Sequence, residues 1–204
     1  MIITIARQFG SGGREIGKKL AKKLGIPFYD NELLLHAAEM SGLSEEIVSH
    51  FDEQPTNSLL YSLSTGVYSL NDAGVVNFAQ PVNQRVFQAQ FDAIRALAEK
   101  GPCVIVGRCA DYVLENHENV VTVFLHADLE DRIHRVAEHD GVSSAEAKAQ
   151  INKSDKKRAN YYNFYSGKKW GVASSYDLCI NTSALGYDQT VDFIAEYVQK
   201  AKAK

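Results

Sequence analysis

Short apolar runs alternate along the chain with longer stretches in which apolar residues recur every three or four positions. The run Cys103–Val106 is apolar throughout, which is typical of a strand buried on both faces of a parallel sheet. Apolar runs predict strands at residues 2–6, 28–29, 103–106, 119–125 and 176–180. Helical periodicity predicts helices at residues 14–24, 31–40, 82–100, 110–114, 128–138, 143–162 and 187–202. This alternation indicates an α/β fold with helices on both faces of the sheet.

Residues 41–100 are predicted to be helical but interrupted. Within them, short helices are expected from Ser44 and across Thr56–Tyr68, and a loop is marked by Asn71, Gly74 and Pro81. Residues that favour helix N-termini precede three other predicted helices; they are Asn31, Asp128, and either Ser143 or Ser144.

Composition and charge narrow the class of protein. A chain of 204 residues, 45% hydrophobic and 23% charged, is expected to form one folded domain. The net charge of −3 argues against a strongly basic surface that binds nucleic acids. Three cysteines without a C-x-x-C spacing argue against a disulfide framework and favour a reducing compartment. No run reaches 18 apolar residues, so we expect a cytoplasmic protein that binds neither membranes nor nucleic acids.

Four small residues, Gly10–Gly13, join the first predicted strand to the first predicted helix. Without Cβ atoms, backbone N–H groups can converge on an anion, and the helix N-terminus adds a favourable dipole. A merely tight turn would need only two glycines. The position and length of this run therefore favour a phosphate-binding loop.

The loop departs from the common phosphate-binding spacing G-x-x-x-x-G-K-[ST]. With Gly12 as the second glycine, Arg7 stands at the first glycine, Gly13 at the lysine and Arg14 at the hydroxyl residue. A dinucleotide-binding G-x-G-x-x-G does not fit either, because Glu15 stands at its third glycine.

Nearby residues could replace the missing groups. Arg14 or Lys18 could supply the positive charge, and Ser11 could supply the hydroxyl that binds a metal ion. The spacing does not decide which of these two cations supplies the charge.

Gly107 and Arg108 directly follow the predicted strand 103–106. In open α/β sheets ligands bind beyond the carboxyl ends of the strands, and an arginine there can hold a phosphate through two parallel hydrogen bonds. The alternative is an ordinary surface arginine. Val106 stands where a metal-binding aspartate would be expected, and Asp111 follows one helical turn later.

Residues 153–169 form a basic segment with six cationic residues and one acidic residue, Asp155. Aromatic residues are interleaved with it, so the segment could close over a polyphosphate. A solvated helix face and a nucleic-acid patch are the alternatives. Asp155 and Arg158 are three residues apart and are predicted to face the same side of a helix.

Arg132 and Arg135 share a face of the predicted helix 128–138. They could flank a nucleotide base or a transferring phosphate. Alternatively, they could form surface ion pairs with acidic neighbours on the same helix, which are Glu130, Asp131 and Glu138.

Five segments then carry a family resemblance, in this order: ITIARQFGSGGREIGKKLAKKLGIPFYD, CVIVGRCADYVL, VTVFLHADLEDRIHRV, DKKRANYY and WGVASSYDLCINTS. Through them the chain resembles the cytidylate kinase-like branch of the P-loop nucleoside monophosphate kinases. The resemblance implies a single domain with a three-layer α/β/α P-loop NTPase fold and a five-stranded parallel sheet. The implied core comprises residues 1–40, 101–140 and 172–204, with a helical acceptor-binding insert at about 41–100 and a lid at about 141–171.

The resemblance also implies roles for individual residues. The donor site, which binds the phosphates of ATP, would contain Gly10, Ser11, Gly12, Gly13, Arg14 and Glu15. Ser11 would contact Mg²⁺, and Arg132 would lie near the donor nucleotide. The implied catalytic residues are Arg14, Arg108, Asp155 and Arg158, of which Arg108 holds the acceptor monophosphate and the last two belong to the lid.

The expected activity is transfer of the γ-phosphoryl group of ATP, with Mg²⁺, to a nucleoside monophosphate such as CMP or dCMP. Gly13 and Val106 stand where cytidylate kinases carry a lysine and an aspartate. Two alternatives therefore stay open: a non-catalytic nucleotide-binding or regulatory module, and a kinase of another small metabolite. The expected partners are small nucleotides, and both a monomer and a homo-oligomer remain open.

Overall fold

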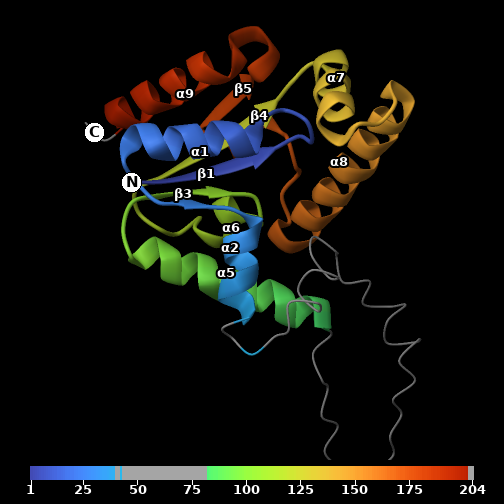
Figure 1. Ribbon diagram of the computed structural model, residues 1–204. Helices are drawn as coiled ribbons and strands as arrows, with labels where there is room; N and C mark the ends of the chain where they lie inside the picture. Colours follow the sequence, from blue (N-terminus) through green and yellow to red (C-terminus); the bar gives the residue numbers. More distant parts are fainter. Residues whose placement is uncertain (40–41, 43–81, 202–204) are drawn as a thin grey trace, which may run out of the picture.

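The computed structural model describes residues 1–39, residue 42 and residues 82–201. Within them lies a five-stranded parallel sheet in the order β2-β3-β1-β4-β5 (Figure 1). The strands are β1 (Ile2–Arg7), β2 (Phe28–Tyr29), β3 (Cys103–Val106), β4 (Val120–His126) and β5 (Leu178–Asn181). The predicted parallel sheet is confirmed.

Helices connect these strands in the order that the periodicity predicts. They are α1 (Gly13–Leu24), α2 (Asn31–Glu39), α5 (Val82–Glu99), α6 (Ala110–Val113), α7 (Leu129–Asp140), α8 (Ser144–Ser166) and α9 (Thr182–Ala201). A 3₁₀ turn, Ala173–Ser175, precedes β5. Helices lie on both sides of the sheet (Figure 1), which confirms the three-layer arrangement.

Alternate residues of the central strands are buried in two separate cores. On one face Ile3 and Ile5 of β1 pack with Ile16 of α1 and Ile194 of α9. On the other face, a cluster joins residues of the sheet to α2, α5 and α6, namely Ile2, Cys103, Ile105, Leu34, Ile94, Ala98, Ala110 and Val113. Both faces of β1 and β3 are therefore covered, as their continuous apolar sequence requires.

The described part of the predicted insert is α5, which packs on the sheet through Ile94 and Ala98. The helices predicted from Ser44 and across Thr56–Tyr68 lie outside the described residues, as does the loop predicted at Asn71, Gly74 and Pro81.

Helices α7 and α8, here called the α7–α8 arm (residues 129–166), stand together beside the sheet (Figure 1). They share an apolar cluster that includes Ile133, Val136 and Ile151, and Phe9 from the loop after β1 packs against it. Ser143 caps α8 in a reciprocal capping box with Glu146. The arm is thus built around its own small core and is joined to the loop through Phe9.

The cap of one helix, α2, differs from the prediction. Asp30, rather than Asn31, caps α2, because the Asp30 carboxylate accepts the N–H of Glu32 at 3.1 Å. The Asn31 side chain instead accepts a hydrogen bond from Arg108. Helix α9 spans Thr182–Ala201, but Gly186 interrupts it with φ 70° and ψ 177°, so its long continuous part begins at Tyr187, as predicted.

None of the helices in the described part of the chain combines the length and apolar character needed to cross a bilayer.

Candidate functional site

The loop between β1 and α1 is fixed by hydrogen bonds on both of its sides. Gly10 and Gly12 have φ values of 77° and 81°, in the left-handed region that glycine adopts most easily. The buried hydroxyl of Ser11 donates to the Gln8 carbonyl at 2.9 Å, and the Ser11 carbonyl accepts from the Thr182 hydroxyl at 2.9 Å. The loop leads directly into the N-terminus of α1, which is a favourable place for an anion.

A methyl group at position 12 would overlap the ring of Tyr187. Gly12→Ala is therefore expected to lower the free energy of unfolding by about 2–4 kcal/mol, because overpacking adds to the cost of a positive φ. Urea unfolding measures this loss. Gly25→Ala is the matched control, since Gly25 has a φ of 66° but open space around its Cβ position. Equal losses in the two variants would contradict the role given to Tyr187.

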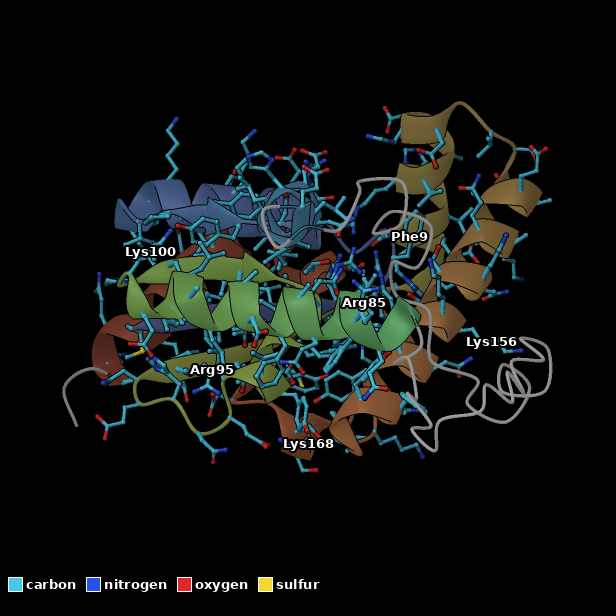
Figure 2. The ribbon with its side chains drawn as sticks, turned by 90° about the horizontal axis from the view of Figure 1, so that it is seen from below. Phe9, Arg85, Arg95, Lys100, Lys156 and Lys168 are labelled. Atoms are coloured by element: carbon cyan, nitrogen blue, oxygen red, sulfur yellow. The ribbon has the colours of Figure 1, made fainter. Side chains whose placement is uncertain are left out.

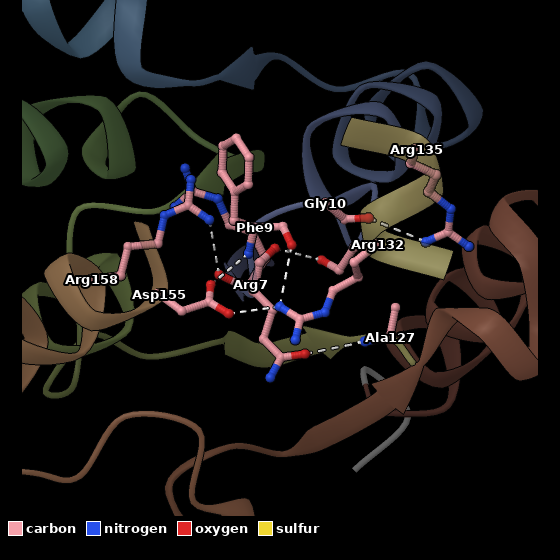
Figure 3. A network of polar contacts seen from close by, with 10 residues as sticks. Arg7, Phe9, Gly10, Ala127, Arg132, Arg135, Asp155 and Arg158 are labelled. Atoms are coloured by element: carbon pink, nitrogen blue, oxygen red, sulfur yellow. Dashed lines mark hydrogen bonds and ion pairs between the residues drawn. The ribbon is translucent and has the colours of Figure 1, made fainter. Parts of the chain in front are cut away.

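Asp155 of α8 joins the glycine loop to the α7–α8 arm (Figure 3). One oxygen of its carboxylate accepts the Phe9 N–H at 2.7 Å, and the other pairs with Nη1 of Arg132 at 2.6 Å. Nη1 of Arg132 also donates to the Phe9 carbonyl at 3.3 Å. Only 9% of the Arg132 side chain and 18% of the Asp155 side chain are exposed, so this ion pair is largely shielded from water.

Two further arginines of the arm donate to backbone carbonyls, one in the loop and one at the end of β1. Arg135 reaches the carbonyl of Gly10 at 3.2 Å, and Arg158 reaches that of Arg7 at 3.3 Å (Figure 3). The Arg135 guanidinium also lies over the ring of Tyr187, 5.3 Å from its centre. The arm therefore holds the loop at several backbone positions.

The basic segment 153–169 divides into outward and inward side chains. Lys153, Lys156 and Lys157 are exposed, and Figure 2 shows Lys156 and Lys168 on the α8 side of the molecule. Lys168 forms an ion pair with Glu115 at 3.0 Å. Arg158, in contrast, faces the loop, and so does Asp155, as their three-residue spacing predicts.

A pocket lies at the carboxyl ends of β1 and β3, beside the glycine loop. Three arginines from three different elements line it: Arg7, Arg108 and Arg158. The remaining lining residues are Thr4, Ile5, Ala6, Gly107, Cys109, Ala110, Asp111, Tyr161, Tyr162 and Trp170. The predicted position of Arg108 at the end of a buried strand is thus confirmed, and it lies in a concave site.

The turn that carries Arg108 is conformationally strained. Gly107, Arg108 and Cys109 have φ values of 89°, 57° and 54° in succession. Such a conformation costs on the order of 1–3 kcal/mol per non-glycine residue and is concentrated at functional sites. Arg108 is 4% exposed, and its Nε donates to Asn31 Oδ1 at 2.8 Å. The strain and the Asn31 contact together orient the guanidinium.

One carboxyl group, that of Asp111, shares the pocket with the arginines. It accepts a hydrogen bond from the Tyr162 hydroxyl at 2.7 Å. Burial raises the pKa of Asp111 above its ordinary value, although the Tyr162 hydrogen bond opposes that rise. The same burial, with the neighbouring Asp111 charge, raises the pKa of Tyr162. The pocket thus holds a buried carboxyl group whose pKa is raised above that of an exposed aspartate.

Three of the predicted donor-site residues have surroundings that the sequence did not reveal. Arg14 pairs with Asp30 at 2.8 Å and Glu32 at 3.1 Å, and 64% of its side chain is exposed. Glu15 is exposed on the first turn of α1. Arg132 pairs with Asp155, so the surface ion pairs considered for Arg132 are wrong.

Sequence reasoning missed Arg7, Asn31 and Tyr187 as parts of the site. Arg7 had a usable signal, because it is a cation directly before a glycine loop that lacks the usual lysine. Asn31 and Tyr187 gave none, since their contacts to Arg108 and Gly12 join segments far apart in the sequence.

Comparison with known proteins places this geometry in context. The model of the cytidylate kinase-like family matches residues 2–184. A cytidylate kinase from Pyrococcus horikoshii is 27% identical over 186 residues, which cover 90% of this chain and 80% of that protein. A cytidylate kinase from Sulfurisphaera tokodaii is 25% identical over 207 residues, which cover 100% and 98%.

Solved structures give a consistent result. An uncharacterized protein from Eubacterium ventriosum superimposes with a TM-score of 0.74 at 32% identity, and the match covers 98% of each chain. Shikimate kinase from Bacteroides thetaiotaomicron superimposes with a TM-score of 0.56 at 16% identity, covering 100% of this chain and 99% of that one. The second similarity concerns the fold alone and confirms the predicted three-layer arrangement.

Proposed function

Because the chain belongs to the cytidylate kinase-like family, we propose that it transfers the γ-phosphoryl group of ATP to a nucleoside monophosphate, with CMP or dCMP as the acceptor. The observation that carries this proposal is the pocket in which Arg7, Arg108 and Arg158 meet beside the glycine loop. Three guanidinium groups in one concave site are suited to the phosphates of a donor and an acceptor. The names of the two relatives support cytidine nucleotides as the acceptor class.

The donor phosphates are proposed to bind at Gly10–Gly13 and the N-terminus of α1. The positive φ values of Gly10 and Gly12 support a loop that exposes backbone N–H groups to an anion. ATP would enter as its Mg²⁺ complex. The hydroxyl of Ser11 is buried and donates to Gln8, so it does not fit the role of a Mg²⁺ ligand in this conformation. Phosphate oxygens and water are the ligands that Mg²⁺ commonly keeps in such sites.

The acceptor phosphate is proposed to bind Arg108. A planar guanidinium can donate two parallel hydrogen bonds to one phosphate, and Asn31 fixes the orientation of the group from the Nε side. Arg158 borders the same pocket and is placed to neutralise charge on the transferring group.

The transfer itself asks for little covalent chemistry from the protein. An oxygen of the acceptor phosphate attacks the γ-phosphorus. The bond between that phosphorus and the β–γ bridging oxygen breaks, and ADP leaves with this oxygen. The protein therefore acts by aligning two anions and by neutralising their charge.

A second candidate function is favoured by Asp111. A phosphate acceptor needs no base at neutral pH, whereas an alcohol must lose a proton as it is phosphorylated. The buried carboxyl group of Asp111 lies in the same pocket as the three arginines. A kinase of a small hydroxylated metabolite would use it.

A coupled assay of ADP release separates these functions. The full chain with ATP and Mg²⁺ is tested with CMP, dCMP, UMP, AMP, shikimate and other small alcohols. ADP release that rises with CMP or dCMP is the expected result. Release that rises only with an alcohol would favour the second function. ATP binding without any acceptor-dependent release would overturn both and would leave a non-catalytic nucleotide-binding module.

A further inference from the structure

Gly13 is the first residue of α1 and stands where phosphate-binding loops usually carry a lysine. A Cβ atom at position 13 would lie 2.7 Å from Cγ and 2.8 Å from Cβ of Arg7. Real Cβ atoms do not approach other atoms so closely. The stem of Arg7 therefore fills the space into which a side chain from position 13 would have to enter.

Gly107 borders the other end of the Arg7 side chain. A Cβ atom at position 107 would overlap Nη1 of Arg7 and would lie 3.0 Å from its Cζ. Gly107 directly precedes Arg108, and both line the pocket together with Arg7. The Arg7 side chain thus runs from the start of α1 to the end of β3, between two glycines that leave room for it.

The backbone of Arg7 is held more firmly than that of a loop residue. Arg7 is the last residue of β1 and pairs in register with Leu125 of β4. Its carbonyl accepts a hydrogen bond from Arg158 (Figure 3). A side chain anchored on the central strand starts from a fixed point, which favours a well-defined position of its charge.

We propose that Arg7 supplies the positive charge that a lysine at position 13 would otherwise bring to the donor phosphates. This inference rests on the proposed function insofar as the glycine loop binds the phosphates of ATP. It explains why position 13 is glycine, since the stem of Arg7 fills the space there, whereas the φ of 89° at Gly107 favours glycine in any case. Arg7, rather than Arg14, is then the catalytic cation of the loop, since Arg14 pairs with Asp30 and Glu32.

Exchange of the charge between the two positions tests the proposal. Arg7→Met keeps the unbranched stem and removes the charge, so kcat/KM for ATP is expected to fall about 100-fold or more, the usual cost of one lost transition-state donor. Gly13→Lys alone is expected to be impaired, because its side chain meets Arg7. The double variant Arg7→Ala/Gly13→Lys is expected to regain at least tenfold over Arg7→Ala. Full activity in Arg7→Met, or no recovery in the double variant, would overturn the proposal.

Binding measurements keep this test independent of the acceptor. Calorimetric titration with inorganic tripolyphosphate and with ATP is expected to show weaker binding to Arg7→Met and recovery in the double variant. Arg95→Ala is the matched control, since Arg95 is an exposed arginine on α5 that contacts the ring of Phe91 and lies away from the α7–α8 arm (Figure 2). If no acceptor supports turnover but this binding pattern holds, the proposed function fails and the role of Arg7 stands. Thermal unfolding of each variant is recorded as well, which shows whether a loss of binding comes from unfolding. Unchanged binding of tripolyphosphate and ATP to Arg7→Met would reject the role of Arg7.

Discussion

Arg108→Ala is expected to lower kcat/KM for the acceptor nucleotide by about a thousandfold, because truncating one partner of a buried charge pair costs on the order of 2–5 kcal/mol. Arg108 is 4% exposed, so water would not replace the lost hydrogen bonds to the acceptor phosphate. Binding of ATP should change little, since the proposed donor site lies at Gly10–Gly13. Initial rates over a matrix of ATP and CMP concentrations measure both effects.

Arg108→Lys separates charge from geometry at the same position. A lysine keeps the positive charge but can neither donate two parallel hydrogen bonds nor reproduce the Nε contact to Asn31. We expect an intermediate loss, carried mainly by KM for the acceptor. Asn31→Ala should lie closer to the wild type, because it removes only the group that orients the guanidinium. A wild-type rate in Arg108→Ala, or an equal loss for ATP and CMP, would refute the assignment of Arg108 to the acceptor.

The strands and most helices were predictable because their signals are local. Strand β3 is buried on both faces and therefore has an unbroken apolar run. Helix α1 is buried on one face, so its apolar residues recur at helical spacing. The cap of α2 was missed for the opposite reason. Asp30 and Asn31 are adjacent and cap helices about equally well, so the distant contact between Asn31 and Arg108 decides which of them does so.

The position of a site residue was predictable only where the residue lies at the end of a predicted strand or on a known face of a predicted helix. Arg108 ends a buried strand, so its place at the edge of the sheet followed from the fold. The three-residue spacing of Asp155 and Arg158 correctly placed both on one face of α8. The position of Arg7 depends on how β1, α1 and the end of β3 pack together, which no spacing along the chain reveals.

Asp155→Ala is expected to destabilise the protein by about 3 kcal/mol, because it leaves the largely buried charge of Arg132 without its partner and the Phe9 N–H without its acceptor. In a chain of this length such a loss lowers the melting temperature by roughly 6–12 °C. The double variant Asp155→Leu/Arg132→Met removes both charges, so it should recover part of the loss. Thermal unfolding of Asp155→Leu, Arg132→Met and the double variant measures the coupling between the two side chains.

The same variants distinguish two roles for Asp155. The resemblance implies a contact with the acceptor, whereas the geometry places the carboxylate between the Phe9 N–H and Arg132. If Asp155 acts only through the loop, Asp155→Ala should weaken binding of ATP, and the double variant should regain part of that binding together with part of its melting temperature. If Asp155 contacts the acceptor, KM for CMP should rise in every variant that lacks the carboxylate, whatever its stability. A wild-type melting temperature in Asp155→Ala would contradict the first role, because removing a carboxylate that holds the loop to the arm should destabilise the protein.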